Sequence, residues 1–246
     1  MTGDQARAAA AAEAIVELDA ITRRLRRECP WDRAQDDRSI VPHTVEEAYE
    51  LADAAASGDD AKLLDELGDV LFQVHFLALL LEERGSGDLG AVAANTAAKL
   101  IRRHPHVFGA VEVGGSDDVR SNWERIKRDE EGRGAGGPFA DVPENLPGPL
   151  YARKLQRRAA SAGMPGPAAD GAEALARLEA ALAALRAAPP SADPEHASAG
   201  ERDEADAAVG RLLLAAVDVA RIARVDPELA LRRAADRLRG AEQGEA

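Results

Sequence analysis

The chain has 246 residues, of which 46% are hydrophobic and only 3% aromatic, and its formal net charge at pH 7 is −13. So few aromatic residues argue against an all-β sandwich, because strands draw on aromatic and β-branched side chains. The negative charge argues against a nucleic acid polymer as partner, since phosphate backbones bind positively charged surfaces. The single cysteine, Cys29, excludes an intrachain disulfide.

The apolar runs are too short for a membrane span, because none reaches the ~18–20 uncharged residues that a transmembrane helix needs. The N-terminal segment carries Asp4, Glu13 and Glu17, and acidic residues of this kind are not typical of a secretory or transit peptide. We therefore expect a cytoplasmic protein that has no membrane partner.

A helical stripe of apolar residues opens the chain over 11–27, with successive spacings of three, three and four residues: Ile15, Leu18, Ile21 and Leu25. Pro30 then indicates a turn or an extended segment. Thr44, followed three residues later by Glu47, has the spacing of a capping box, so it predicts the start of a second helix.

Glycine, aspartate and proline residues mark the later boundaries of the first half. The helices that they predict cover, in order, 44–57, 61–84, 88–104 and a segment that begins at Ser116 or Asp117. An irregular stretch, 106–115, precedes the last of these helices.

The segment 132–150 is rich in glycine and proline, and it predicts a linker. The helical stretches expected after it are 150–162, 171–188, 201–224 and 227–239. No alternating apolar and polar pattern of useful length predicts a strand. We therefore expect an all-α protein whose helices pack antiparallel in a bundle.

The two halves of the chain resemble each other. Residues 66–71 and 208–213 each place a glycine, Gly68 or Gly210, between apolar residues at the start of a long apolar helix. This match is short, but the order and spacing of the helices around it agree. The pattern favours two tandem helical repeats.

Four carboxylates form the sharpest pattern in the sequence. Glu47 and Glu50 lie three residues apart on one predicted helix, and Glu66 and Asp69 lie three residues apart on the next. A short turn between these helices should pack them antiparallel, so that the two pairs face each other. Four carboxylates in one place repel strongly, and Mg²⁺ or Mn²⁺, which prefer hard oxygen ligands, would remove that repulsion.

A solvated acidic face is the other interpretation of these residues. Apolar neighbours on both helices favour the metal site over it: Val45, Ala48, Leu51, Leu64, Leu67 and Val70. A di-iron carboxylate bundle needs a Glu-x-x-His motif, whereas this chain has Glu66-x-x-Asp69. We therefore set the di-iron interpretation aside.

The acidic motif resembles the signature of the MazG family of all-α nucleoside triphosphate pyrophosphohydrolases. Further segments agree with that family: Cys29-Pro30-Trp31-Asp32, Glu66-Leu-Gly-Asp69-Val-Leu-Phe-Gln73, Lys99-Leu-Ile-Arg102-Arg103-His104-Pro-His106-Val-Phe108 and Trp123-Glu-x-Ile-Lys127. The resemblance covers about residues 15–131 and implies a MazG-type fold of the four-helix-bundle kind.

The resemblance implies Mg²⁺-dependent hydrolysis of a nucleoside triphosphate, NTP or dNTP, to the monophosphate and pyrophosphate. In the family, the positions that match Glu47, Glu50, Glu66 and Asp69 hold the metal, for which Mn²⁺ is a possible substitute. Glu46 or Glu50 could take the proton of the attacking water, and sequence does not separate these two. The cellular task would be sanitation or regulation of the nucleotide pool.

Two cation-bearing helix faces lie beyond the acidic motif. Lys99 and Arg103 are four residues apart, as are Trp123 and Lys127, and in the family the matching positions contact the nucleotide. The alternatives are ordinary surface cations and a tryptophan that fills the core. Trp31 and Asp32 could line the base pocket, or could equally anchor the start of a helix.

The second half lacks the acidic motif, because Ala208 and Arg211 stand where the first half has its second acidic pair. We therefore expect a catalytic repeat over 1–131, a linker over 132–150 and a degenerate repeat over 151–246 that binds no metal and serves packing. Repeats that keep their apolar stripes should pair into four-helix bundles, which predicts a homodimer. The rival function is a nucleotide-binding regulatory or interaction module without turnover, and four intact acids favour the enzyme.

Overall fold

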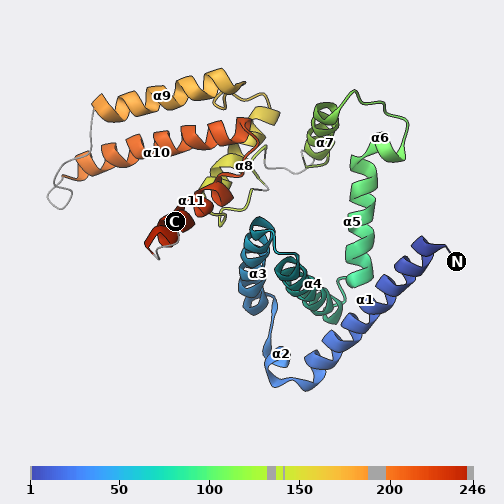
Figure 1. The fold of residues 1–246 in the computed structure, drawn as a ribbon. Helices are drawn as coiled ribbons and strands as arrows, with labels where there is room; N and C mark the ends of the chain where they lie inside the picture. The colour runs from blue at the N-terminus through green and yellow to red at the C-terminus, as the bar shows by residue number, and fades with distance from the viewer. Residues whose placement is uncertain (1, 132–136, 141, 188–197, 243–246) are drawn as a thin grey trace. The chain divides into compact units, whose positions relative to one another are not determined.

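The computed structural model describes residues 2–131, 137–140, 142–187 and 198–242, and over these ranges the regular structure is helical, with no strand (Figure 1). The all-α prediction is confirmed for this part of the chain. The chain folds into two compact units, Met1–Ala110 and Val111–Ala246. Among the described helices, none combines the length and the apolar character needed to cross a membrane.

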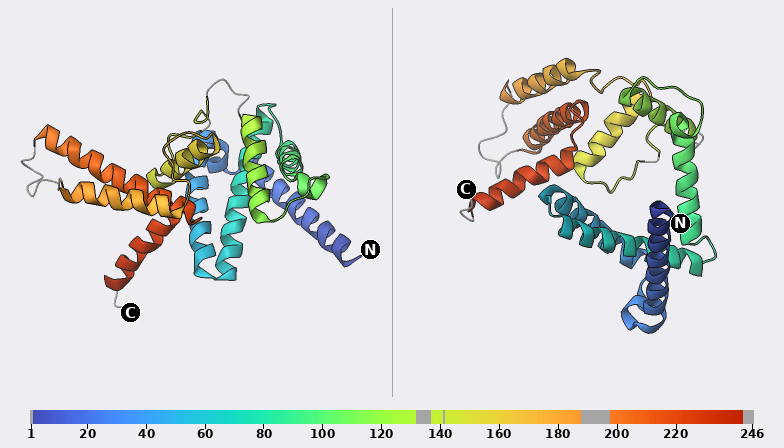
Figure 2. Two further views of the ribbon diagram at one scale, coloured as in Figure 1. Left: turned by 90° about the horizontal axis from the view of Figure 1, so that it is seen from above. Right: turned by 45° about the vertical axis from the view of Figure 1, so that its right-hand side comes forward.

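Each unit is a set of packed helices (Figures 1 and 2). The first contains α1 (Gly3–Glu28), α2 (Pro30–Ala34), α3 (Asp37–Ser57), α4 (Asp60–Glu83), α5 (Leu89–Arg103) and α6 (Pro105–Phe108). The second contains α7 (Ser116–Glu131), α8 (Gly148–Ser161), α9 (Gly171–Ala187), α10 (Ala199–Ile222) and α11 (Pro227–Glu242).

The start of the second predicted helix is wrong. Helix α3 begins at Asp37, and its N-cap is Asp36, whose side chain accepts hydrogen bonds from the backbone N–H groups of Arg38 and Ser39. Thr44 lies inside α3 and donates its hydroxyl to the Ile40 carbonyl, at 3.3 Å. A strong N-cap further upstream therefore overrides the capping-box spacing at Thr44.

Three prolines lie in helices at positions where the sequence predicts no helix. Pro30 occupies the first position of α2, where a missing N–H costs nothing, so the chain there is helical rather than extended. Pro42 lies inside α3. A third proline, Pro105, begins the short helix α6, so the chain up to Phe108 is helical where the sequence predicts an irregular stretch from 106 onward.

Helices α3 and α4 form an antiparallel hairpin, and the views in Figures 1 and 2 agree in placing them side by side. Gly58 ends α3 with a φ of 74°, in the left-handed region that glycine adopts without strain, and Asp59 caps α4. An ion pair joins Lys62 to Asp53 near the turn, at 2.8 Å. Another joins the two far ends, Arg84 to Asp37, at 2.6 Å.

The core of this hairpin is small and apolar. Ile40 of α3 packs with Phe76 and Leu80 of α4, and Phe72 and Leu77 flank them. The rings of Phe72 and Phe76 lie 5.9 Å apart, as expected for two core residues one helical turn apart. The core therefore sits toward the C-terminal half of α4, and the N-terminal half is left for the carboxylates.

Two arginines of α1 form ion pairs with glutamates at the C-terminal end of α4. Arg23 binds Glu82 at 2.6 Å, and Arg26 binds Glu83 at 2.8 Å. The Arg26 guanidinium also donates to the backbone carbonyls of Asp32 and Gln35, at 2.5 and 3.0 Å, and lies over the Phe76 ring. The Arg26 side chain therefore links three parts of the first unit: α1, α4 and the segment that contains α2.

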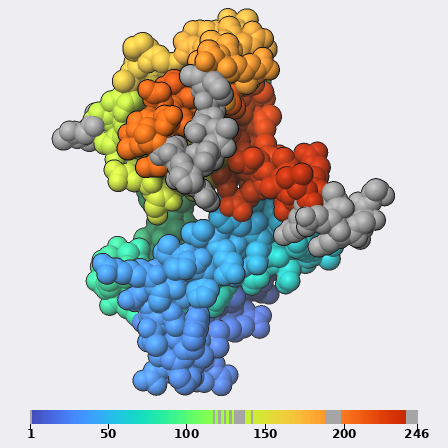
Figure 3. Space-filling model, turned by 90° about the vertical axis from the view of Figure 1, so that its left-hand side faces the viewer, coloured from blue at the N-terminus to red at the C-terminus, as the bar shows by residue number. Residues whose placement is uncertain are grey.

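In the second unit, α9 pairs with α10, and α8 packs on both α10 and α11. Asp218 of α10 is buried, and it accepts hydrogen bonds from the Ala168 backbone N–H and the Arg221 guanidinium, both at 2.7 Å. Figure 3 shows α9 at the surface of this unit, in light orange.

Helix α7 belongs to the second unit, whereas the sequence pattern groups its residues Trp123 and Lys127 with the first repeat. Of the expected linker, residues 132–136 and 141 lie outside the described part of the chain. The division into a catalytic repeat, a linker and a degenerate repeat stays a prediction.

We expect Arg26→Ala to destabilise the protein by about 1.5–3 kcal/mol, because hydrogen bonds from a charged group to partly buried acceptors contribute that much. Arg26 is 17% exposed, whereas Arg24, which pairs with Glu28 on the same helix, is 73% exposed. Arg24→Ala is therefore the matched control and should cost less than ~0.5 kcal/mol. Urea unfolding followed by far-UV circular dichroism measures both, and equal losses would contradict the linking role of Arg26.

Candidate functional site

Three of the four predicted metal ligands meet across the α3–α4 hairpin. Glu47 projects from α3, and Glu66 and Asp69 project from α4, one turn apart. Each offers an oxygen atom, and these atoms all lie within 4.8 Å of one another. We call these three residues the carboxylate cluster.

The register of the hairpin explains why these residues meet. Asp37 pairs with Arg84 at one end and Asp53 with Lys62 at the other, so positions between them face each other in reverse order. Thr44 lies within hydrogen-bonding distance of Gln73, at 3.3 Å, on the core side of the cluster. The carboxylates therefore lie between a polar contact on one side and the ion pair at the turn on the other.

The cluster is electrostatically unfavourable without a counter-ion. Burial raises the pKa of Glu47, and the charges of Asp69, Glu50 and Glu66 raise it further. Burial likewise raises the pKa of Glu66, and the charges of Glu50 and Asp69 add to it. Lys62 is the opposing influence, since its positive charge lowers the pKa of Glu66.

Hard oxygen donors on two rigid helices fit Mg²⁺ or Mn²⁺, which take octahedral oxygen coordination. Glu50, the fourth predicted ligand, is exposed and lies outside the carboxylate cluster. Its charge still acts on both Glu47 and Glu66, so it lies close to the same place. The donor set therefore fits a divalent cation, with Glu50 at its edge.

Glu46 and Glu50, the predicted proton acceptors, occupy different surroundings. Glu46 is exposed, and its Oε2 lies 3.9 Å from Nδ1 of His43, one turn earlier on α3. Sequence reasoning missed His43, although its spacing of four residues from Glu47 places both on one face of the helix.

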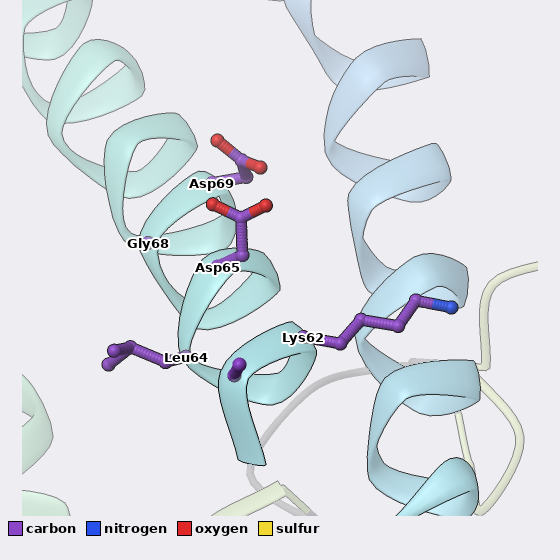
Figure 4. A pocket seen from close by; sticks show the side chains of 6 residues that line it. Lys62, Leu64, Asp65, Gly68 and Asp69 are labelled. Carbon is purple, nitrogen blue, oxygen red and sulfur yellow. The ribbon is translucent and has the colours of Figure 1, made fainter. Parts of the chain in front are cut away.

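An open pocket of about 570 Å³ adjoins the cluster along α4. It is lined by Ala61, Lys62, Leu64, Asp65, Gly68 and Asp69 (Figure 4). Asp69 belongs to both the pocket and the carboxylate cluster, and Lys62 extends toward the neighbouring helix. A Cβ at Gly68 would meet no described atom within 4 Å, so the space beside this glycine is open.

The predicted nucleotide contacts fall in both units. Lys99 and Arg103 are partly buried on α5, which packs against α4 in the first unit. Trp123 is partly buried on α7, in the second unit. The side chain of Lys127 lies outside the described part of the structure. These four contacts stay predictions.

Comparison with protein families finds a match over residues 35–108 to the MazG nucleotide pyrophosphohydrolase domain. The matched range contains the whole α3–α4 hairpin and therefore the acidic residues of the candidate site: Glu46, Glu47, Glu50, Glu66 and Asp69.

Curated relatives extend this match. The nucleoside triphosphate pyrophosphohydrolase of Escherichia coli (strain K12) is 43% identical over 136 residues, which are 55% of this chain and 52% of the relative. The nucleoside triphosphate pyrophosphohydrolase/pyrophosphatase MazG of Thermotoga maritima is 36% identical over 220 residues, 89% of this chain and 80% of the relative. The chain thus spans about half the length of the Escherichia coli relative and most of the Thermotoga maritima one.

We expect Mg²⁺ or Mn²⁺ to raise the melting temperature at pH 7, because an ion that binds only the folded state stabilises it by about 2.7 kcal/mol at 100 times its Kd. Glu66→Gln should remove this response. Differential scanning calorimetry with and without the metal measures it, and Glu13→Gln on the exposed part of α1 is the control. A metal response that survives in Glu66→Gln would contradict the ligand role of Glu66.

The Glu66→Gln variant also tests the repulsion between Glu66 and the neighbouring carboxylates. Because the folded state raises the pKa of Glu66 above its ordinary value of 4.5, the ionised carboxylate destabilises the fold at neutral pH and not below pH 4.5. Without metal, Glu66→Gln should therefore melt higher than wild type at pH 7, and the difference should shrink as the pH falls toward 4.5. A constant difference across this range would contradict the assigned cause.

Proposed function

The chain belongs to the MazG family of nucleotide pyrophosphohydrolases, and from this premise we propose that it hydrolyses nucleoside triphosphates, NTP or dNTP, to the monophosphate and pyrophosphate. The observation that carries the proposal is the carboxylate cluster of Glu47, Glu66 and Asp69, whose mutual repulsion a divalent cation relieves. The names of the Escherichia coli and Thermotoga maritima relatives support the same reaction.

In the proposed reaction, the oxygen of a water molecule attacks the α-phosphorus. The bond between this phosphorus and the oxygen that bridges to the β-phosphate breaks, and that oxygen leaves with pyrophosphate. Glu46 or Glu50 accepts the proton of the water, since both carboxylates lie beside the cluster on α3 and are exposed to solvent.

Mg²⁺, with Mn²⁺ as a substitute, is the proposed cofactor, held by Glu47, Glu66 and Asp69 with Glu50 at the edge. When bound, it would neutralise phosphate oxygens and favour ionisation of the attacking water. The residues of the chain position the substrate around it. Lys99 and Arg103 of α5 are proposed nucleotide contacts. On α7, Trp123 is a proposed stacking surface for the base and Lys127 a proposed phosphate contact.

The proposed cellular task is sanitation or regulation of the nucleotide pool. The substrate is small, and the net charge of −13 disfavours polymeric nucleic acid as a partner. The alternative function is a nucleotide-binding regulatory module without turnover, for which the acids would have no chemical task. Three carboxylates brought within 4.8 Å favour the enzyme over this alternative.

Assembly is part of the proposal. Large apolar side chains remain exposed on several helices of the first unit, among them Ile21 on α1, Val45 on α3 and Leu67 on α4. Exposed apolar surface on this scale is typical of an interface. We infer that the chain forms a homodimer in which repeats pair into four-helix bundles.

We expect wild-type protein to release pyrophosphate from a nucleoside triphosphate with Mg²⁺ and to release none with EDTA. Glu66→Gln and Asp69→Asn should each lower the rate at least about 100-fold, because each removes one carboxylate ligand of the cation that would neutralise the phosphates. Helix content by circular dichroism should be unchanged, and Asp60→Asn, at the exposed start of the same helix, is the matched control. Binding without pyrophosphate release in the wild type would favour the regulatory module.

Light scattering in solution tests the assembly. The proposed dimer should give twice the chain mass of 25.9 kDa. Leu67→Glu, on the exposed face of α4, should shift the mass toward one chain, because a buried charge opposes apolar contact. A wild-type mass of one chain at micromolar concentration would contradict the pairing of repeats between two copies.

A further inference from the structure

A cavity of about 230 Å³ lies along one face of α8 in the second unit. Three cations and two leucines line it: Leu146, Leu150, Arg153, Lys154 and Arg157. From Leu150 onward these residues follow one another at intervals of three, one and three positions, so they share one face of the helix. Ala159, on the opposite side of α8, is buried, and Gln156 donates to the Leu214 carbonyl of α10 at 2.9 Å. Helix α8 therefore packs on its unit with other faces than the one that carries the cavity.

The charge of this face is opposite in sign to that of the chain. The formal net charge is −13, whereas α8 contains four cations and no acidic residue. Cations three and four residues apart on a helix repel each other, and Arg157 has this spacing from both Lys154 and Arg153. A bound anion would turn this repulsion into attraction.

Arg153 is held in place by an ion pair with Asp226. Asp226 is itself fixed, because it accepts a hydrogen bond from the Leu229 backbone N–H in the first turn of α11, at 3.1 Å. The ion pair uses one nitrogen of a guanidinium that carries five N–H donors. An arginine that is already restricted loses less side-chain freedom when another of its N–H groups binds an anion.

The size of the cavity limits the class of ligand. Pockets for drug-sized molecules enclose about 300–1,000 Å³, so a cavity of about 230 Å³ fits a small anion rather than a whole nucleoside triphosphate. A phosphate group has the charge and the several acceptor oxygens that arginine and lysine bind. The two leucines reduce the water beside the cations and so strengthen their attraction for an anion.

We propose that this cavity is a binding site for a small anion that carries a phosphate group, held by Arg153, Lys154 and Arg157. Pyrophosphate and a nucleoside monophosphate both carry that group, and they are the products of the proposed reaction. The site differs in kind from the carboxylate cluster, because its cations bind the anion directly and need no metal ion. All of its lining residues belong to the second unit, so it gives this unit a task besides packing.

The first test locates the anion by lysine footprinting, because the chain has only four lysines: Lys62, Lys99, Lys127 and Lys154. The whole wild-type chain is acetylated in EDTA with an N-hydroxysuccinimide ester, with and without pyrophosphate, and mass spectrometry measures each lysine. We expect pyrophosphate to slow the acetylation of Lys154 several-fold and to leave Lys62 unchanged. Equal reactivity of Lys154 in both samples, or protection of Lys99 alone, would overturn the proposal.

The second test measures affinity by titration calorimetry in EDTA, with pyrophosphate as the probe. Lys154→Gln and Arg157→Gln should each weaken binding about ten-fold, because each removes a charge-assisted hydrogen bond. Arg186→Gln removes an exposed cation from α9, so as the matched control it should stay within about two-fold of wild type. Equal affinities of Arg157→Gln and Arg186→Gln would contradict the site. The wild-type footprint needs no substitution, so it decides the matter even where a variant fails to fold.

AMP and adenosine separate the two sources of the phosphate group in the same titration. Tighter binding of pyrophosphate than of AMP would identify the inorganic anion as the ligand, and the reverse order would identify the nucleoside monophosphate. Adenosine lacks the phosphate group and should not bind. Adenosine that bound as tightly as AMP would refute recognition of the phosphate.

Failure of this proposal is distinguishable from failure of the proposed function. Protection of Lys154 in EDTA requires no turnover, so it would stand even if the wild-type protein released no pyrophosphate from a nucleoside triphosphate with Mg²⁺. Active wild-type protein whose Lys154 is equally reactive with and without pyrophosphate would refute the anion site alone.

Discussion

Repulsion among carboxylates is the constraint on which the first unit depends. Glu47, Glu66 and Asp69 are held within 4.8 Å, although burial and mutual charge raise the pKa values of Glu47 and Glu66. Two antiparallel helices oppose that repulsion with a core at one end, around Phe76, and an ion pair at the other, between Asp53 and Lys62. Arginines of α1 bind the C-terminal end of α4, at the core end of this hairpin.

Much of the helix order is predictable from sequence, because glycine and aspartate give unambiguous signals at short turns. Gly58 and Asp59 mark the turn between α3 and α4, and the hairpin follows from them. Thr44 misleads because a capping-box spacing also arises inside a helix, where Asp36 has already supplied the N-cap. Periodicity likewise fixes α1 only as far as its apolar stripe extends, whereas alanine propensity carries the helix back to Gly3.

The candidate site is only partly predictable for a different reason. Spacings of three along each helix place Glu66 beside Asp69, and the short turn brings both to Glu47. Contacts that depend on packing between elements leave no such local signal. The ring contact between Trp31 and His43 joins α2 to α3, and no spacing in the sequence encodes it. Lys62 was missed because its effect on Glu66 depends on the side-chain geometry at the turn.

Gly68 has a mechanical consequence for the helix that carries two of the acids. A glycine in a helix interior lowers local helix stability by about 0.8–1.0 kcal/mol relative to alanine. Among described atoms, a Cβ there would meet nothing within 4 Å, so packing within the unit does not require the glycine, and the same holds for Gly210 of α10. Helix α4 is therefore softer between Glu66 and Asp69 than its packing demands. The lower helix propensity of glycine therefore falls between Glu66 and Asp69, on the stretch of α4 that carries two acids of the carboxylate cluster.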